Sequence, residues 1–301
     1  MRRVSGVDVM LLSTVLLWAL NITVTRYVVD NGFHPLAYGT IRYFAAILLF
    51  WCFTWWRERS FRIARSDFKL ILLAAFFIFM NQISFVTSVH LTSATTVGLV
   101  LGTTPIFVGI IATLVGLERL GSAFWIAAVV SFVGVGLIAA GASSGVGGSL
   151  LGNALAVATA ATWAAYSVTV APLMKRYSPF RISSLVLAIG WVPLAFVSIP
   201  QIASQSFDSF GWTMAFAFAF AVVGPLFLTN LLWFTAIDRV GPSRAALFAN
   251  LEPFFAVLFA VLLLSEHLSG WEIAGGVAIG VGILIERRGQ PEGEPLVVLG
   301  E

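Results

Sequence analysis

The sequence predicts an all-α, polytopic membrane protein with ten transmembrane helices in two inverted five-helix repeats. Hydrophobic residues make up 59% of the chain and charged residues only 10%, whereas a soluble domain contains about 25% charged residues. Apolar runs near 20 residues, the length that crosses about 30 Å of hydrocarbon, recur from end to end. The stretch PIFVGIIATLVGLERL at 105–120 is also similar in sequence to PFFAVLFAVLLLSEHL at 253–268.

The apolar runs are expected to be helices. Lipid offers no partner to an unpaired backbone group, and the runs lack the alternating period of a barrel strand. Their short connections leave no room for a soluble domain between them. The expected spans are residues 7–29, 36–56, 68–89, 93–115, 122–140, 150–172, 181–199, 211–236, 243–264 and 271–286.

The internal sequence repeat indicates two copies of one unit. Six identities relate the two sixteen-residue stretches at a constant offset of 148 residues, about half the chain. A unit of five spans is odd, so the second copy must enter the membrane from the opposite side. We therefore expect a first repeat over residues 1–142, a second, inverted repeat over 143–288, and a disordered polar tail over 289–301.

Positive charge predicts the orientation of the spans. In the ten-span scheme, fifteen of the seventeen Lys and Arg residues fall on the side of the N-terminus, and short cytoplasmic loops collect such residues. Glu118 is followed by Arg119 on this side, while its counterpart Glu266 is followed by His267 on the other. Both termini are thus expected in the cytoplasm, and no exposed basic face remains for nucleic acid.

The repeated Pro-x12-Glu-x-Leu element at the ends of spans 4 and 9, with LEP at 251–253, resembles the EamA branch of the drug/metabolite transporter superfamily. Within it, the aromatic-rich sequence is most similar to YddG-type aromatic amino acid exporters. The resemblance implies a multi-pass carrier of the bacterial inner membrane, surrounded by lipid, with a small-molecule substrate and no cofactor. Inverted repeats place such a substrate site near the midplane between the halves.

Two ionisable residues fall well inside the expected spans, where a charge costs roughly 2.5 kcal/mol or more. Glu252 lies close to the midplane, and its counterpart in the first repeat is Thr104. This difference favours contact with a substrate ammonium; the alternative is a carboxyl that fixes its helix beside Pro253. Arg42 is expected near enough to the outer interface to extend towards it, or else to bind a substrate carboxylate.

Prolines interrupt two of the spans. Pro105 and Pro253 each remove a helix hydrogen bond in mid-span and free a carbonyl four residues earlier, at Leu101 and Ala249. Freed backbone groups at membrane depth are tolerated where they line a cavity. We therefore expect either a gating helix break or a kink that serves only packing.

Polar and aromatic side chains recur on the helix faces that would surround a cavity. Asn81 and Phe85 match Asn230 and Phe234 in the second repeat, and each amide needs a partner in protein or water. Aromatic residues with a polar edge suit a pocket that stacks an aromatic ring, although a packing role is an equal alternative. The further candidates for this pocket are Trp18, Asn21, Trp163, Tyr166 and Trp233.

Glycines and histidines predict packing and interface roles. The pairs Gly98/Gly102 and Gly276/Gly280 have the small-x3-small spacing of closely packed helices. The three histidines are isolated, so no metal site is expected. His90, at the outer end of span 3, is a candidate for an external gate or an interfacial residue.

Other membrane protein classes lack their characteristic residues here. An intramembrane protease needs a second acid, a metal cluster or a nucleophile with its base, and a retinal protein needs a mid-span lysine. We expect an exporter of aromatic amino acids, with Glu252 at the ammonium and Asn81, Asn230 or a backbone amide at the carboxylate. A sugar-phosphate or nucleotide-sugar carrier and a channel stay open as alternatives.

Overall fold

The computed structural model describes residues 6–116, 121–143, 148–207, 210–240 and 248–289. Every regular element within these ranges is helical. Glu118 and Arg119, residues 243–247 of the predicted ninth span, and the tail from residue 290 lie outside them. The elements are α1 (Gly6–Asp30), α2 (Pro35–Glu58), η1 (Arg65–Asp67), α3 (Phe68–Leu91), α4 (Ala94–Leu101), α5 (Thr104–Leu114), α6 (Ser122–Ser143), α7 (Leu150–Met174), α8 (Pro179–Ala203), α9 (Trp212–Val222), η2 (Val223–Leu228), α10 (Thr229–Val240), α12 (Glu252–Leu264) and α13 (Gly270–Gly289).

The prediction of a polytopic membrane protein is confirmed. Eight helical segments among the described residues are long and apolar enough to cross a membrane, and two shorter apolar helices cover Glu252–Leu264 and Gly270–Ile285. Large apolar side chains also stand on the outside of the helices. Trp212, Leu114 and Phe216 are 92%, 79% and 77% exposed, which is costly in water and favourable in lipid.

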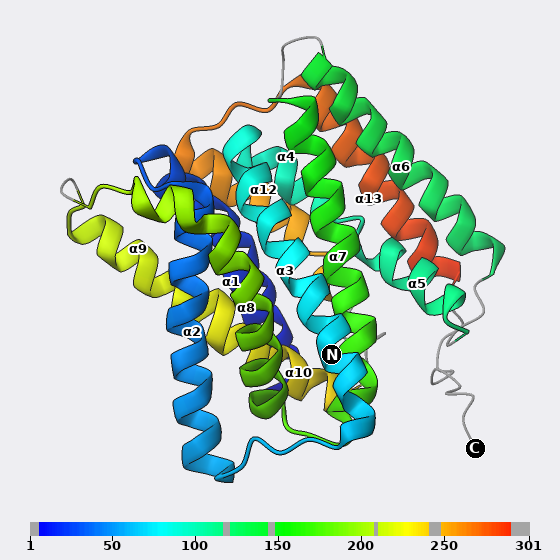
Figure 1. Ribbon diagram of the computed structural model, residues 1–301. Coiled ribbons are helices and arrows are strands. Elements are labelled where there is room, and N and C mark those ends of the chain that lie inside the picture. Colours follow the sequence, from blue (N-terminus) through cyan, green and yellow to red (C-terminus); the bar gives the residue numbers. More distant parts are fainter. Residues whose placement is uncertain (1–5, 117–120, 144–147, 208–209, 241–247, 290–301) are drawn as a thin grey trace.

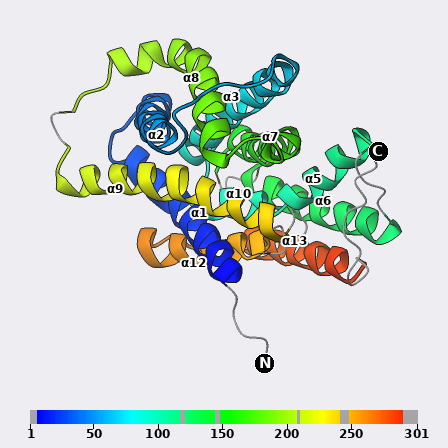
Figure 2. The same ribbon diagram turned by 90° about the horizontal axis from the view of Figure 1, so that it is seen from below.

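Helices from the first half of the chain pack against helices from the second half. Helix α3 lies along α7, α2 along α8, and α6 along α13, the last pair forming one edge of the molecule in Figure 1. Helix α1 packs against α12, α10 and α9, as the view in Figure 2 shows. The interior of the bundle is therefore built from both halves.

A break interrupts the fourth predicted span. Helix α4 ends at Leu101 and α5 begins at Thr104, with Pro105 in its first turn, where a missing N–H is tolerated. Pro253 occupies the same place in α12. Both prolines thus start a helix, as the predicted helix breaks require.

Close helix packing is confirmed at three of the four predicted glycines. A Cβ added to Gly98 would lie 2.4 Å from Ala256 Cβ, and one added to Gly102 would lie 2.6 Å from Pro253 Cγ. These two glycines let α4 approach α12. A Cβ added to Gly276 would lie 2.9 Å from Leu99 Cδ2 of α4. At Gly280 an added Cβ would meet nothing within 4 Å, so the packing role predicted for that residue is wrong.

One end of the bundle, termed here the basic end, joins the segment before α3 to the turn between α7 and α8. Arg176 Nη1 lies 2.6 Å from Asp67 Oδ1, and Arg181 Nη2 lies 2.6 Å from Glu58 Oε2. The hydroxyl of Ser178 also donates to Glu58. Charged pairs therefore link the two halves at this end.

The opposite end is linked by neutral side chains and helix caps. Gln205 Oε1 accepts a hydrogen bond from the backbone N–H of His34 at 2.7 Å, and Gln201 Oε1 accepts one from Leu36 at 2.7 Å. The carboxylate of Glu266 accepts from the first two backbone N–H groups of α4 at 2.9 Å each, which satisfies orphan donors of that helix.

Candidate functional site

Four aromatic side chains from α1, α7 and α10 meet in the middle of the bundle; they are called the aromatic cluster here. The ring centroid of Trp18 lies 5.4 Å from that of Trp163 and 4.9 Å from that of Trp233. Tyr166 continues the cluster, 5.4 Å from Trp163. Trp163 and Tyr166, three residues apart in α7, therefore share one helix face, and Trp18 joins them from the other half.

A π-helical segment positions one edge of this cluster. Element η2 separates α9 from α10 and contains Pro225, and π-helical turns occur often at functional sites. The hydroxyl of Thr229 donates to the Pro225 carbonyl at 2.5 Å and accepts from Trp18 Nε1 at 2.9 Å. The irregular backbone thus fixes the orientation of the Trp18 indole.

Two members of the aromatic cluster present polar atoms that no other described residue satisfies. Trp233 Nε1 and Tyr166 Oη are buried and have no hydrogen-bond partner. A buried polar group without a partner carries a desolvation cost. Both atoms therefore keep unused hydrogen-bonding capacity inside the cluster.

A second group, called the polar chain here, runs across α1, α2, α3 and α7. Arg42 donates from Nη1 to Asn21 Oδ1 and from Nη2 to Gln82 Oε1, both at 3.0 Å. Gln82 Nε2 donates to Asn81 Oδ1 at 3.1 Å, and Asn81 Nδ2 donates to the Thr159 carbonyl at 3.0 Å. Each amide in this chain has a fixed orientation as a result.

Arg42 does not extend towards an interface. Its side chain is 1% exposed, and its guanidinium carbon lies 4.8 Å from the centroid of Tyr38 and 5.8 Å from that of Phe85. The interfacial location considered for Arg42 is therefore wrong, because α1 and α3 enclose its head group. Phe85 contributes to this site as an aromatic face over the cation.

The aromatic cluster and the polar chain adjoin each other along two helices. Trp18 and Asn21 are three residues apart in α1, about 4.5 Å along the axis. On α7, Thr162 accepts weakly from Asn81 at 3.5 Å and immediately precedes Trp163. The two groups are therefore neighbours in the interior of the bundle.

Glu252 begins α12 and is half-buried. It makes no hydrogen bond or ion pair with any other described residue. Helix α12 packs against α1, which also bears Trp18 and Asn21. Helix α12, which begins at Glu252, thus contacts the helix that joins the two groups, and the Glu252 carboxyl has no partner in the part of the chain described.

The structure does not bring the two predicted asparagines together. Asn81 belongs to the polar chain, whereas Asn230 Nδ2 donates within its own helix, to the Leu226 carbonyl at 2.5 Å. Both amide groups thus donate a hydrogen bond to a backbone carbonyl.

The carbonyl expected to be freed by Pro105 is not free. Thr104 Oγ1 donates to the Leu101 carbonyl at 2.6 Å, so a side chain replaces the helix hydrogen bond that proline removes. The expectation of an exposed carbonyl at Leu101 is therefore wrong. Hydroxyl-bearing residues often repair the backbone in this way beside helix breaks in membranes.

His90 lies outside this central site. Its side chain is exposed and lines a polar hollow of about 410 Å³ at the end opposite the basic end, with Arg26, Glu266, His267 and Glu272. Among the described residues, no group of three or more His, Cys, Asp or Glu side chains has an arrangement that could hold a metal ion. A gate role for His90 stays a prediction.

Three residues of the site were not predicted from the sequence. Gln82 and Tyr38 contact Arg42, and Thr229 holds Trp18. Gln82 directly follows Asn81 and lies one helical turn before Phe85, which places it on the correct face. This helical spacing was the available signal, but Gln82 has no match in the second repeat to draw attention to it.

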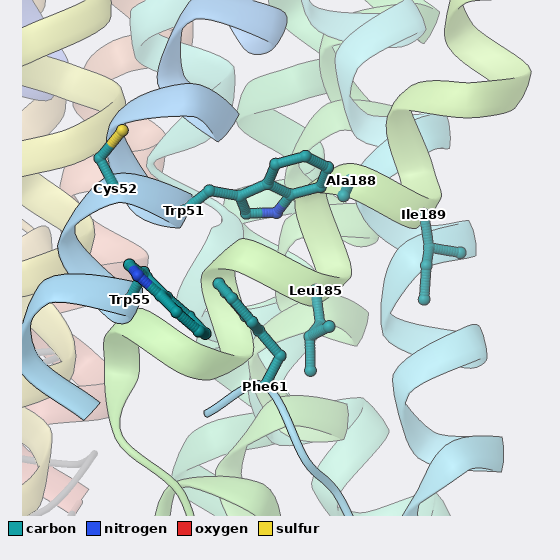
Figure 3. Close-up of a pocket in the computed structure, with 7 residues that line it drawn as sticks. All are labelled: Trp51, Cys52, Trp55, Phe61, Leu185, Ala188 and Ile189. Atoms are coloured by element: carbon teal, nitrogen blue, oxygen red, sulfur yellow. The ribbon is translucent and has the colours of Figure 1, made fainter. Parts of the chain in front are cut away.

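A larger apolar hollow, of about 490 Å³, lies on the outer face between α2 and α8 (Figure 3). Trp51, Cys52 and Trp55 line it from α2, facing Leu185 and Ile189 of α8. Apart from Trp51 Nε1, which donates to the Ser184 carbonyl at 3.1 Å, its lining offers few groups for recognition. The polar groups converge instead on the interior site.

Comparison with known proteins places the chain in a family. The sequence model of the EamA-like transporter family matches residues 6–140 and 150–286. The chain belongs to the EamA-like transporter family. An EamA-like protein with these apolar helices is a multi-pass membrane transporter, and its named relatives are transporters rather than enzymes.

Relatives and a solved structure extend the likeness over nearly the whole chain. Uncharacterized transporter YetK of Bacillus subtilis is 24% identical over 79% of this chain and 74% of its own length. An uncharacterized transporter of Archaeoglobus fulgidus is 24% identical over 93% of this EamA-like chain and 99% of its own. A crystal structure of similar fold, 18% identical, superposes with a TM-score of 0.67 over 96% of this chain and 99% of the other.

Proposed function

We propose that this EamA-like transporter exports aromatic amino acids by alternately exposing a midplane cavity to the two sides of the membrane. The observation that carries the proposal is the aromatic cluster beside the buried polar chain. An amphipathic molecule with an aromatic ring needs an apolar face and a few convergent polar groups. The YddG-type exporters that the sequence resembles have such substrates.

The helix contacts support two inverted repeats, with residues 1–142 and 143–288 as the halves. Helix α3, third in the first half, lies on α7, first in the second half. Reciprocally, α9 and α10 lie on α1. The second helices of both halves pair as α2 and α8, and the fifth helices as α6 and α13. Such exchanged contacts are what a two-fold axis generates, and the family sequence model matches the chain in two stretches.

The two linked ends provide the contacts that alternating access must break. Opening at the basic end separates Glu58 from Arg181 and Asp67 from Arg176. Opening at the other end separates Gln201 and Gln205 from the backbone at the start of α2. A carrier breaks one set at a time, so the bound substrate never connects both sides.

Glu252 is the partner for the substrate ammonium in this proposal. Its carboxyl is half-buried and unengaged by described residues, and an ionised carboxylate only accepts hydrogen bonds. The aromatic ring of the substrate stacks on Trp18, Trp163 or Trp233. Stacking contributes about 0.5–1.5 kcal/mol beyond area burial, about tenfold in affinity at most, so we expect preference rather than strict selection.

Transport by purified protein in liposomes tests the proposed substrate class. We expect uptake of labelled phenylalanine that saturates, is inhibited strongly by tryptophan and tyrosine and partly by larger aliphatic amino acids, and ignores sugar phosphates. Saturation separates a carrier from a channel. Equal inhibition by a sugar phosphate and tryptophan would instead favour a phosphate carrier.

The orientation proposed for the inner membrane has its own test. With Cys52 replaced by serine, single cysteines are introduced as Ser60→Cys at the basic end and Ser204→Cys at the opposite end. An impermeant thiol reagent added outside intact cells should label only the second. Labelling of both variants from one side would exclude inverted halves with cytoplasmic termini.

A further inference from the structure

Arg42 is a buried cation held by neutral partners. Its side chain is 1% exposed, and the groups that accept its hydrogen bonds are the amide oxygens of Asn21 and Gln82. Within the described ranges no carboxylate lies within ion-pair distance of it. Buried charges are normally paired, so the site holds a positive charge that no described carboxylate neutralises.

Arginines at the ends of the bundle show the usual arrangement. Arg26 Nε lies 2.7 Å from Asp30 Oδ2, and Arg176 and Arg181 have carboxylate partners as described above. These three are more exposed than Arg42 and need a partner less. Other described arginines without a carboxylate partner, such as Arg57, Arg59, Arg62 and Arg65, are exposed, whereas Arg42 is buried.

The guanidinium retains a free donor edge. Arg42 Nε is buried and has no hydrogen-bond partner among the described residues, and neither has Tyr38 Oη, whose ring lies against the same head group. Arginine presents its N–H groups as a planar fork that matches a carboxylate. The unused Nε–H and an N–H of the neighbouring Nη therefore form a pair of parallel donors suited to a carboxylate.

The polar chain fixes Gln82 as a neutral hydrogen-bond acceptor for Arg42. Because Asn81 donates to the Thr159 carbonyl, its Oδ1 faces Gln82, which must then donate Nε2 to it and turn Oε1 towards Arg42. The chain orients the head group without neutralising it. Asn21, the other partner, is only half-buried and lies on the same helix as Trp18 of the aromatic cluster.

We propose that Arg42 is the anion-binding residue of the transport site and takes the carboxylate of the transported molecule. This proposal rests on the proposed function, since it assumes that the interior site is where substrate binds. Asn21 lies one helical turn from Trp18, so a carboxylate at Arg42 and a ring in the aromatic cluster suit one amino acid. The carboxylate then does not depend on Asn81 or Asn230, whose amide donors are already engaged.

The test compares acids with their uncharged amides. Binding of phenylalanine and phenylalaninamide, and of benzoate and benzamide, is measured by thermal stabilisation of the purified full-length protein. Wild type should prefer each acid by about tenfold to a hundredfold, as a charge-assisted hydrogen bond implies. Arg42→Gln should remove the preference, and Arg42→Lys should keep part of it. Arg26→Gln, which removes an arginine that already has a carboxylate, is the matched control and should leave it intact.

Gln82→Glu separates an anion site from a structural role. The new carboxylate would lie about 3 Å from Arg42 Nη2 and supply an internal partner. We expect this variant to unfold at or above the wild-type temperature and yet to lose the preference for acids. A folded Gln82→Glu protein that still prefers acids would overturn the proposal, as would a wild type that binds acid and amide equally or neither.

The two benzene derivatives distinguish this inference from the proposed function. If benzoate is preferred over benzamide through Arg42 while phenylalanine neither binds nor is transported, the anion site stands and the aromatic amino acid proposal fails. If phenylalanine is transported equally by wild type and Arg42→Gln, the aromatic amino acid proposal stands and the anion site at Arg42 fails.

Discussion

The two mid-span prolines start their helices alike, but the residues before them differ. In the first half Thr104 donates its hydroxyl to the Leu101 carbonyl at 2.6 Å, replacing the hydrogen bond that Pro105 removes. In the second half the same position holds Glu252, which makes no hydrogen bond to a described residue. The shared break is thus repaired locally in one half, whereas the other half retains a carboxyl that is available to a ligand.

This difference indicates that the helix break is a structural feature and that it forms without a carboxyl at this position. A hydroxyl is sufficient to stabilise the break at Thr104. The Glu252 carboxyl has no hydrogen-bond partner among the described residues, so the break does not account for a carboxyl in the interior, where it carries a cost. Contact with a substrate ammonium accounts for it in the proposed function.

The largest expected effect comes from removing the carboxylate. Glu252→Gln should lower phenylalanine uptake by about tenfold to a hundredfold, because a hydrogen bond to a charged group contributes about 1.5–3 kcal/mol. Glu252→Thr, which copies the first half, should lower it as much while leaving a folded protein. Uptake in liposomes and thermal unfolding are measured side by side. Near-normal uptake by Glu252→Thr would remove the distinction between the halves.

A smaller effect is expected where the two breaks meet. Gly102→Ala places a Cβ 2.6 Å from Pro253 Cγ, and such overpacking costs about 1–3 kcal/mol. The unfolding midpoint should fall. Gly280→Ala, whose Cβ has open space, is the matched control and should unfold at or above the wild-type temperature. Equal behaviour of the two variants would mean that α4 and α12 are not in this contact.

The smallest effect is expected in the first half, where Thr104 replaces the hydrogen bond that Pro105 removes. Thr104→Val keeps the side-chain shape and removes the donor to Leu101, which should destabilise the protein by about 1 kcal/mol and leave phenylalanine uptake close to wild type. Thr104→Ser keeps the hydroxyl and serves as the control. A loss of uptake in Thr104→Val as large as in Glu252→Gln would assign both halves the same role.

The sequence predicted most helix positions and the residue types of the site, but not their partners. The spans 7–29, 68–89 and 150–172 lie within two residues of α1, α3 and α7 at either end, because apolar length and the membrane fix them. The π-helical turn at 223–228 and the burial of Arg42 depend on tertiary contacts. They were not predictable from periodicity, since Thr229 and Gln82 acquire their roles only when other helices approach.

The contrast between Thr104 and Glu252 is tested most directly by a ligand that lacks only the ammonium. Phenylalanine and 3-phenylpropionate share the ring and the carboxylate, so a difference in their affinities reports the ammonium contact. Titration of both into purified wild type and Glu252→Gln should show that wild type prefers phenylalanine and that the variant has lost this preference. An unchanged preference for phenylalanine in Glu252→Gln, or no preference in wild type, would contradict the role assigned to Glu252.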